Sequence, residues 1–246
     1  MPGLRQVGDL EFLQIVECEG VDFMNGWKTL RAQDGFEVNA YVAEPPFEPI
    51  AGLVVIQEIF GVNDHIRSVV DAYARDGFLA VAPAIFDRLE RGVELRYEGE
   101  DMQKARVLAM KLKMDDVLLD ANAAIEYARK STGKKTGVIG YCLGGSVAWL
   151  AACRLKVDAA VGYYGGQIAQ HVAETPKCPV VLHFGDKDAH IPAEMVNKIA
   201  ASHPEVAIFR YEAGHGFNCD ARSAFEPASA KLARERSLKF LKDALA

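Results

Sequence analysis

Short apolar blocks alternate along the chain with longer blocks in which apolar residues recur at helical spacing. Residues 27–30 and 36–42 flank the turn residues Gln33-Asp34-Gly35 and predict an antiparallel hairpin. The run 52–59 is apolar on both faces, as in a central strand covered by helices, and a helix follows between Asp64 and Gly77. The same patterns predict strands at 78–82, 138–140, 159–163, 179–184 and 206–211, and helices at about 101–113, 115–130, 146–154, 193–202 and 227–245.

Strands that alternate with helices and lack a polar face are typical of a mainly parallel sheet. We therefore expect residues 27–246 to form one α/β domain, in which helices cover both faces of a central sheet and the hairpin adds antiparallel strands. Residues 1–26 have only a weak apolar pattern. They form an N-terminal arm of unknown role, or translation starts at Met24, and the sequence leaves both interpretations open.

Composition narrows the class of protein. The 246 residues carry a net charge of −6 without a Lys/Arg cluster, which argues against a nucleic-acid partner. Apolar runs are only strand-sized, so we expect no membrane span, and the N-terminus lacks the pattern of a signal peptide. Five cysteines without a CxxC pair indicate free thiols in the cytoplasm. We expect a small-molecule substrate, no metal or organic cofactor, and a monomer or weak homo-oligomer.

One motif combines a sharp turn with a nucleophile. The apolar strand 138–140 runs into Gly140-Tyr141-Cys142-Leu143-Gly144-Gly145, and an apolar helix follows. This Gly-x-nucleophile-x-Gly spacing is that of a strained strand-to-helix elbow, with cysteine where serine is more usual. The helix N-terminus would direct free N–H groups at a developing oxyanion. The motif alone also fits an inert buried cysteine.

Two further residues make the catalytic interpretation stronger. A thiol nucleophile needs a base, and the base needs an orienting acid. Asp188 and His215 each follow a predicted strand, and Cys142, Asp188 and His215 occur in the order nucleophile, acid, base that α/β-hydrolases use. Asp186 is a rival for the acid. The other five histidines lack this placement, and we interpret them as structural or exposed.

Four motifs, in order, resemble the dienelactone hydrolase (carboxymethylenebutenolidase) family. They are Gln57-Glu58-Ile59-Phe60-Gly61, the 140–145 elbow, Val161-Gly162-Tyr163-Tyr164-Gly165 and Ala213-Gly214-His215-Gly216-Phe217. The resemblance covers the chain from about Trp27 onward and implies an α/β-hydrolase fold. It also implies that Cys142, Asp188 and His215 are the catalytic triad of an enzyme that hydrolyses small lactones through a thioester.

The resemblance extends to residues around the triad. It implies that Glu58 holds and activates the resting thiol, and that the backbone N–H groups of Ile59 and Leu143 form the oxyanion hole. A buried carboxylate at a strand end needs a partner, which supports the assignment of Glu58. Arg88 matches an arginine that grips the substrate carboxylate, and Tyr164 is a further expected substrate-binding residue.

One position departs from the family pattern and affects the expected substrate. The family typically has a second carboxylate-binding arginine four residues after the catalytic histidine, where this chain has Cys219. Arg222, three residues later, is the candidate replacement. Two alternatives therefore stay open: a promiscuous thiol esterase acting on uncarboxylated esters, and a non-catalytic module with a redox-sensitive Cys142.

Overall fold

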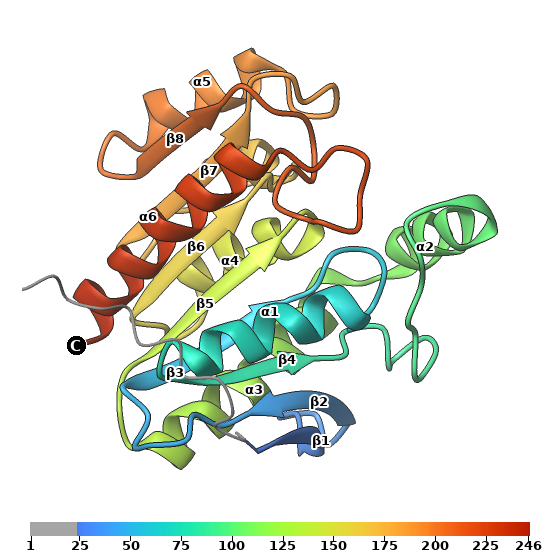
Figure 1. Cartoon of the computed structure of the whole chain (residues 1–246), viewed down its shortest axis with the longest axis vertical. Coiled ribbons are helices and arrows are strands. Elements are labelled where there is room, and N and C mark those ends of the chain that lie inside the picture. The colour runs from blue at the N-terminus through green and yellow to red at the C-terminus, as the bar shows by residue number, and fades with distance from the viewer. Residues whose placement is uncertain (1–23) are drawn as a thin grey trace, which may run out of the picture.

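The computed structural model describes residues 24–246, which form an eight-stranded sheet with helices around it (Figure 1). The N-terminal arm expected at residues 1–26 lies outside the described residues, except for positions 24–26. The strands are β1 (Asn25–Arg31), β2 (Glu37–Ala43), β3 (Ala51–Ile56), β4 (Phe78–Pro83), β5 (Thr136–Tyr141), β6 (Ala159–Tyr163), β7 (Val180–Gly185) and β8 (Ala207–Tyr211). The helices are α1 (Asp64–Arg75), α2 (Gly99–Lys111), α3 (Met114–Thr132), α4 (Leu143–Arg154), the 3-10 turn η1 (Ile168–Gln170), α5 (Ala193–Ser202) and α6 (Pro227–Leu245).

The order of strands in the sheet is β1-β2-β4-β3-β5-β6-β7-β8. Strand β2 is antiparallel to both of its neighbours, and the six strands from β4 to β8 are parallel. The mainly parallel sheet and the N-terminal hairpin are thus confirmed. Strand β4 lies on one side of β3 and β5 lies on the other, so the order of the strands reverses at β3. In α/β proteins, ligands bind at the carboxyl ends of the strands beside such a reversal.

Helices cover both faces of the sheet, as expected. Figure 1 shows α1 and α6 on the face toward the viewer, with α3 and α4 behind the strands. Close backbone approach fixes this packing: a side chain at Gly52 would meet Ala128 of α3 at 2.9 Å, and one at Gly137 would meet Leu245 of α6 at 2.9 Å. Helix α2 lies to one side, beyond the carboxyl ends of the central strands (Figure 1).

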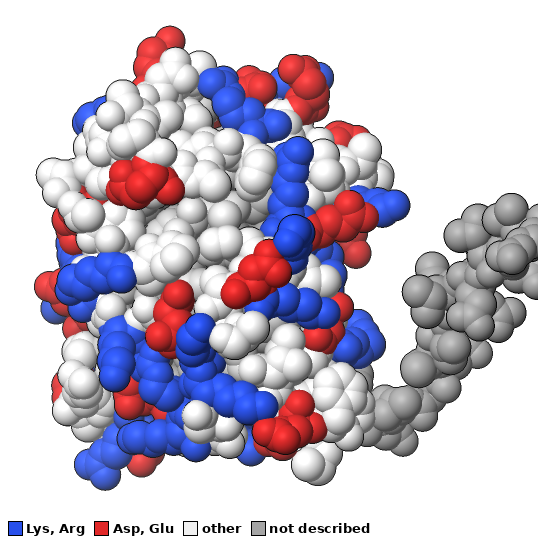
Figure 2. All heavy atoms as spheres, turned by 90° about the vertical axis from the view of Figure 1, so that its left-hand side faces the viewer, with Lys and Arg blue, Asp and Glu red and all other residues white. Residues whose placement is uncertain are grey.

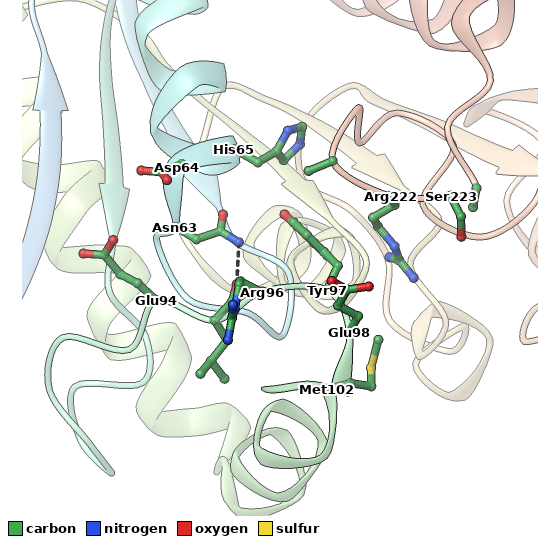
Figure 3. Close-up of a pocket in the computed structure, with 13 residues that line it drawn as sticks. Asn63, Asp64, His65, Glu94, Arg96, Tyr97, Glu98, Met102, Arg222 and Ser223 are labelled. Atoms are coloured by element: carbon green, nitrogen blue, oxygen red, sulfur yellow. Dashed lines mark hydrogen bonds between the residues drawn. The ribbon is translucent and has the colours of Figure 1, made fainter. Parts of the chain in front are cut away.

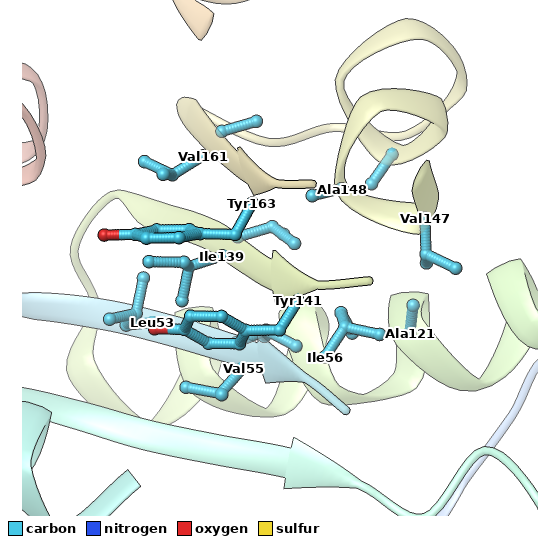
Figure 4. Packing of buried hydrophobic residues seen from close by; sticks show 14 of the residues in the cluster. Leu53, Val55, Ile56, Ala121, Ile139, Tyr141, Val147, Ala148, Val161 and Tyr163 are labelled. Carbon is cyan, nitrogen blue, oxygen red and sulfur yellow. The ribbon is translucent and has the colours of Figure 1, made fainter. Parts of the chain in front are cut away.

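The main core fills the space between sheet and helices. Apolar residues of neighbouring strands, among them Val55, Ile139 and Val161, pack around the rings of Tyr141 and Tyr163, whose centroids are 4.8 Å apart (Figure 4). Full burial of such side chains contributes roughly 1.5–3 kcal/mol each to folding. The core therefore holds the carboxyl end of β5, from which Cys142 projects, in a fixed position.

Local signals in the sequence set the helix ends. The side chain of Asn63 accepts a hydrogen bond from the N–H of Ile66 and caps α1. Glu226 caps α6, whose first residue is Pro227. Gly133 ends α3 in the left-handed conformation, with φ of 66°.

Several boundaries differ by a few residues from the sequence-based expectation, and one contact explains two of them. Strand β3 ends at Ile56 rather than at 59, and α4 begins at Leu143 rather than at 146. A side chain at Gly144 would lie 2.3 Å from the carbonyl oxygen of Ile56 and 2.7 Å from that of Gln57. The first turn of α4 therefore occupies the place into which a longer β3 would extend.

Charged side chains at the amino ends of the strands are paired. Lys134, which precedes β5, binds Glu48 at 2.8 Å, and Arg129 binds Asp158 at 3.0 Å. Figure 2 shows the face of the molecule turned away from α2, where Lys and Arg side chains gather beside acidic ones. Among the residues that the structure describes, no helix has the length and apolar character needed to cross a bilayer.

Candidate active site

The elbow places Cys142 at the junction of β5 and α4. Its backbone angles, φ of 55° and ψ of −113°, are a conformation that residues other than glycine rarely adopt. The turn can be this tight only because glycines line it: a side chain at Gly140 would lie 1.9 Å from the carbonyl oxygen of Gly144. The strain leaves the thiol at the edge of the sheet, partly exposed.

A continuous hydrogen-bonded chain joins three residues expected to act together. His215 Nε2 lies 3.1 Å from Cys142 Sγ, and His215 Nδ1 lies 2.7 Å from Asp188 Oδ2. The other carboxylate oxygen of Asp188 accepts hydrogen bonds from the backbone N–H groups of His190 at 2.8 Å and Ile191 at 3.2 Å. These bonds fix the carboxylate, and the carboxylate fixes the ring of His215.

The surroundings of His215 favour its charged form. Burial lowers the pKa of His215, but hydrogen bonds to Asp188 and Cys142 outweigh burial and raise it to about 10. Burial likewise raises the pKa of Asp188, but hydrogen bonds from His215 and from two backbone N–H groups more than offset it and lower it. An imidazolium hydrogen-bonded to sulfur stabilises the thiolate, which is the nucleophilic form of cysteine.

Asp186, the other candidate for the acid, pairs with a different residue. Asp186 forms an ion pair with Arg210, and its side chain is 33% exposed, whereas that of Asp188 is fully buried. The hydrogen bond to His215 belongs to Asp188 alone of the two. The structure therefore favours Asp188 over Asp186 as the partner of the histidine.

Ile59 and Leu143, the two residues expected to form the oxyanion hole, lie at the cavity beside the thiol. Both residues line the same cavity as Cys142. Leu143 is the first residue of α4, so its N–H has no acceptor within the helix. The contact between Gly144 and the end of β3 brings the loop that carries Ile59 against the start of α4. An oxyanion formed beside Cys142 would thus meet the positive end of the helix dipole.

The cavity beside the thiol has a volume of about 390 Å³, within the range of small-molecule sites. Apolar side chains form much of its wall, including Phe60 and Met110. Its described lining consists of Ile59, Phe60, Met102, Arg106, Ala109, Met110, Cys142, Leu143, Ser146, Gly166, Gln167, His190, His215 and Arg222.

Glu58 is buried, and its partner is an arginine. Glu58 Oε1 accepts a hydrogen bond from Arg222 Nη1 at 3.2 Å, while Oε2 is buried without a hydrogen-bond partner among the described residues. The structure records no hydrogen bond between Glu58 and Cys142, whose sulfur contacts His215 instead. Arg222 lines the cavity, as expected for a substrate-binding residue.

Tyr164 supports the histidine from behind. Its ring is fully buried, lies 5.1 Å from the ring of His215 between centroids, and does not line the cavity. Its backbone φ of 38° is a second strained position near the site. This placement differs from the expectation that Tyr164 contacts substrate, because residues of the cavity wall separate a buried ring from a ligand.

Arg88 does not reach the cavity, contrary to the expectation. Its guanidinium binds Asp120 at 2.8 Å and Asp34 at 2.6 Å, and it stacks on the ring of Phe36. Asp120 is completely buried, so this ion pair also neutralises a charge inside the protein. The loop that carries Arg88 is therefore anchored to the hairpin and to α3, and Arg88 is not among the described residues that line the cavity.

Helix α2 contributes one wall of the cavity, which the sequence did not predict. Met102, Arg106, Ala109 and Met110 line the cavity, and their spacing of three and four is helical. That spacing could have identified one face of a helix, but not that this face borders Cys142. His190 was expected to be structural or exposed, and it also lines the cavity, with its ring centroid 5.3 Å from that of His215.

A larger cavity of about 610 Å³ lies next to the first (Figure 3). Met102 and Arg222 line both cavities, but neither Cys142 nor His215 lines the larger one. Size alone would therefore select a cavity without either of these side chains. The 390 Å³ cavity is lined by both, and it is our candidate active site.

One group of described residues has the spacing of metal ligands. Donor atoms of His65, Cys219 and Asp220 lie within 4.8 Å of one another. His65 Nδ1 and Asp220 Oδ1 are already hydrogen-bonded at 2.9 Å. Burial and the charge of Glu58 raise the pKa of the Cys219 thiol to about 12, which opposes the thiolate that a metal requires. We assign no metal to this group.

The fold and the site together define the class of protein. A mainly parallel sheet in this strand order, with a nucleophile elbow after β5 and a histidine after β8, is that of a hydrolase with the α/β-hydrolase fold. The chain belongs to the dienelactone hydrolase family, because the model of that family matches residues 38–245.

Known relatives agree with this assignment. The chain is 35% identical over 222 residues to a carboxymethylenebutenolidase of Pseudomonas putida, covering 87% of this chain and 94% of the relative. It is 31% identical over 222 residues to carboxymethylenebutenolidase 1 of Cupriavidus pinatubonensis, covering 86% and 94%. A crystal structure from Klebsiella pneumoniae, provisionally named a dienelactone hydrolase, superposes with a TM-score of 0.78 at 29% identity, covering 89% of this chain and 98% of that one.

Proposed function

We propose that this enzyme hydrolyses a small lactone or activated ester of the dienelactone type, with Cys142 as nucleophile, His215 as base and Asp188 as orienting acid. The observation that carries the proposal is the hydrogen-bonded chain from Sγ through the imidazole to the buried carboxylate, at the wall of a cavity. Membership of the dienelactone hydrolase family supports the same reaction class.

The reaction proceeds in two steps. The Cys142 thiolate attacks the carbonyl carbon, and the backbone N–H groups of Ile59 and Leu143 stabilise the oxyanion. The C–O bond breaks, the imidazolium of His215 gives its proton to the departing oxygen, and a thioester remains on Cys142. Neutral His215 then takes a proton from a water molecule, which attacks the thioester and releases a carboxylic acid and the thiolate.

The nucleophile and the cavity limit the substrate. A thiolate is a better leaving group than an amide nitrogen, so a cysteine enzyme of this kind needs an ester with a good leaving group, and we propose no peptidase activity. A volume of about 390 Å³ with an apolar wall suits a small ring or acyl group.

We propose that Glu58 regulates the resting thiol. Glu58 and Cys142 each lie two residues beyond the paired positions Ile56 and Gly140 of adjacent strands, so they project from the same edge of the sheet. A buried carboxylate oxygen without a partner is costly, and Glu58 Oε2 is such an atom. A rotation of Cys142 away from His215 would give this oxygen a thiol proton to accept.

A second candidate is hydrolysis of uncarboxylated esters. Two observations favour it: Cys219 stands where the family has an arginine, and Arg88 is held by two carboxylates outside the cavity. The guanidinium of Arg222 is already paired with Glu58. On these grounds alone a neutral substrate would fit as well as an anionic one.

Rates with dienelactone and with p-nitrophenyl acetate test the reaction class. We expect turnover of both by the wild type, and its loss in Cys142→Ala with unchanged circular dichroism. Cys178→Ala is the matched control, because Cys178 does not line the cavity. Full turnover by Cys142→Ala would refute the mechanism, and alkylation of Cys142 without hydrolysis of any ester would favour a redox-sensitive module.

A further inference from the structure

His190 is held at the candidate active site through its backbone. Its N–H donates a hydrogen bond to Asp188 Oδ1 at 2.8 Å, while the other carboxylate oxygen, Oδ2, binds the ring of His215. The next residue, Ile191, is buried and donates its own N–H to the same Oδ1 at 3.2 Å. One carboxylate therefore fixes both the loop that carries His190 and the ring of His215.

The ring of His190 lies beside that of His215. The two ring centroids are 5.3 Å apart and the ring planes meet at 86°, so the rings are not stacked face to face. Tyr164, whose ring also contacts His215, is fully buried and does not line the cavity. His190, in contrast, lines the cavity and is exposed to solvent. It is therefore the ring neighbour of His215 that water can reach.

The imidazole of His190 is available for hydrogen bonding. Its ring nitrogens form no hydrogen bond or ion pair with another described residue. Both ring nitrogens of His215 are already hydrogen-bonded, and Ser146 Oγ in the same cavity accepts a hydrogen bond from the N–H of Gln167 at 3.0 Å. A neutral imidazole has one N–H donor and one acceptor nitrogen, so it can bind a water molecule in either orientation.

The second step of the proposed reaction needs an ordered water molecule. That water must lie within hydrogen-bond distance of His215 Nε2 and close to the carbonyl carbon of the thioester. One hydrogen bond to His215 leaves the water free to rotate, whereas a second partner fixes its position. Two hydrogen bonds that meet at one water oxygen span up to about 5.6 Å, which is compatible with rings whose centroids are 5.3 Å apart.

Resting on the proposed function, we infer that His190 is a further catalytic residue, which binds the water that hydrolyses the thioester on Cys142. The water oxygen attacks the acyl carbon, one water proton passes to His215 Nε2, and the C–S bond breaks with its electron pair on sulfur. A ring nitrogen of His190 holds the same water by a hydrogen bond, and His190 gains or loses no proton. In the first step the leaving oxygen occupies this place, but its bond to the substrate already positions it, so acylation depends less on His190.

Burst kinetics with p-nitrophenyl acetate separate the two steps. The burst gives the rate constant of acylation, and the decay of acetyl-Cys142 gives that of deacylation. We expect His190→Phe, which keeps a ring but cannot hold water, to lower deacylation at least about tenfold and to leave acylation within about threefold. His190→Asn keeps a donor and an acceptor and should recover most of the deacylation rate. His171→Phe removes a histidine outside the cavity and should leave both rate constants within about twofold.

The possible outcomes separate this inference from the proposed function. An unchanged deacylation rate constant in His190→Phe, with a normal burst in the wild type, would overturn the role of His190 and leave the hydrolase. Equal falls in acylation and deacylation would also overturn it, because they would indicate that residue 190 only positions Asp188 and His215. Ester hydrolysis by the wild type without any acetyl group on Cys142 would overturn the proposed function, and this inference with it.

Discussion

Glu58 and Arg222, 164 residues apart in the chain, meet at 3.2 Å between Oε1 and Nη1, and Arg222 lines the candidate active-site cavity. The side chain of Glu58 is 1% exposed and that of Arg222 is 18% exposed. Burial lowers the pKa of Arg222, but the charge of Glu58 and the other acidic groups around it together outweigh burial and raise the pKa. The pair therefore holds a buried carboxylate behind the wall of the cavity that both Arg222 and Cys142 line.

Replacement of Arg222 by an uncharged residue should destabilise the folded protein. Arg222→Met leaves the Glu58 carboxylate buried without its cation, and we expect a loss of about 2–4 kcal/mol in the free energy of unfolding. Urea denaturation measures this loss, and Arg222→Lys, which retains the charge, should recover part of it. An unchanged denaturation midpoint in Arg222→Met would show that the carboxylate does not depend on this partner.

The two candidate acids are separated by matched substitutions. Asp188→Asn removes the charge that stabilises the His215 imidazolium, and we expect kcat to fall on the order of 10²- to 10⁴-fold. Asp186→Asn loses only an exposed ion pair with Arg210 and should retain kcat within a factor of about two. Comparable losses of kcat in the two variants would contradict the assignment of Asp188 as the orienting acid.

Stability should depend on pH through His215. Its pKa is raised to about 10 in the folded protein from an ordinary value near 6.5. A group whose pKa is raised by folding stabilises the folded protein fully at pH values below its pKa in the unfolded chain. This stabilisation is lost as the pH rises toward its pKa in the folded protein. Between about pH 6.5 and 10 the wild type should therefore lose up to about 1.4 kcal/mol per pH unit from this group. Urea denaturation of wild type and His215→Gln at pH 6, 8 and 10 checks this, and parallel pH curves for the two proteins would contradict it.

The close approach of α4 to β3 predicts a sensitive glycine. Gly144→Ala would place a methyl group 2.3 Å from the carbonyl oxygen of Ile56, and neither backbone can yield without moving the elbow. We expect a loss of about 1–3 kcal/mol in the free energy of unfolding, together with a lower kcat because the N–H of Leu143 shifts. Gly26→Ala meets no atom within 4 Å and should be nearly neutral. Wild-type kcat in Gly144→Ala would argue against an oxyanion hole at this junction.

Much of the fold follows from local signals. Apolar periodicity and turn residues predicted the strands and helices, because most strands of a parallel sheet are buried on both faces and are therefore continuously apolar. The meeting of Cys142, Asp188 and His215 was predictable because each follows a strand of the same sheet, and the carboxyl ends of parallel strands share an edge. Element boundaries were less predictable: the end of β3 depends on a contact with Gly144, 88 positions after Ile56.

The parts of the site that escaped prediction depend on long-range partners. Arg88 was expected at the substrate, but Asp34 in the hairpin turn and Asp120 on α3 hold it elsewhere, and no local pattern around residue 88 reveals them. Arg106 lies in a charged helix whose sequence does not tell which face borders the cavity. Tyr164 belongs to a motif that the resemblance assigned to substrate, yet its ring is buried behind His215.

The central claim, that Cys142 activated by His215 carries the acyl group, is tested most directly by trapping the intermediate. Wild-type enzyme mixed rapidly with p-nitrophenyl acetate and quenched in acid should show a burst of p-nitrophenol and an acetyl group on the peptide that contains Cys142. His215→Gln should form this adduct at least about 100-fold more slowly. Hydrolysis at the wild-type rate with no acyl group on Cys142, or with the group on another residue, would contradict the account.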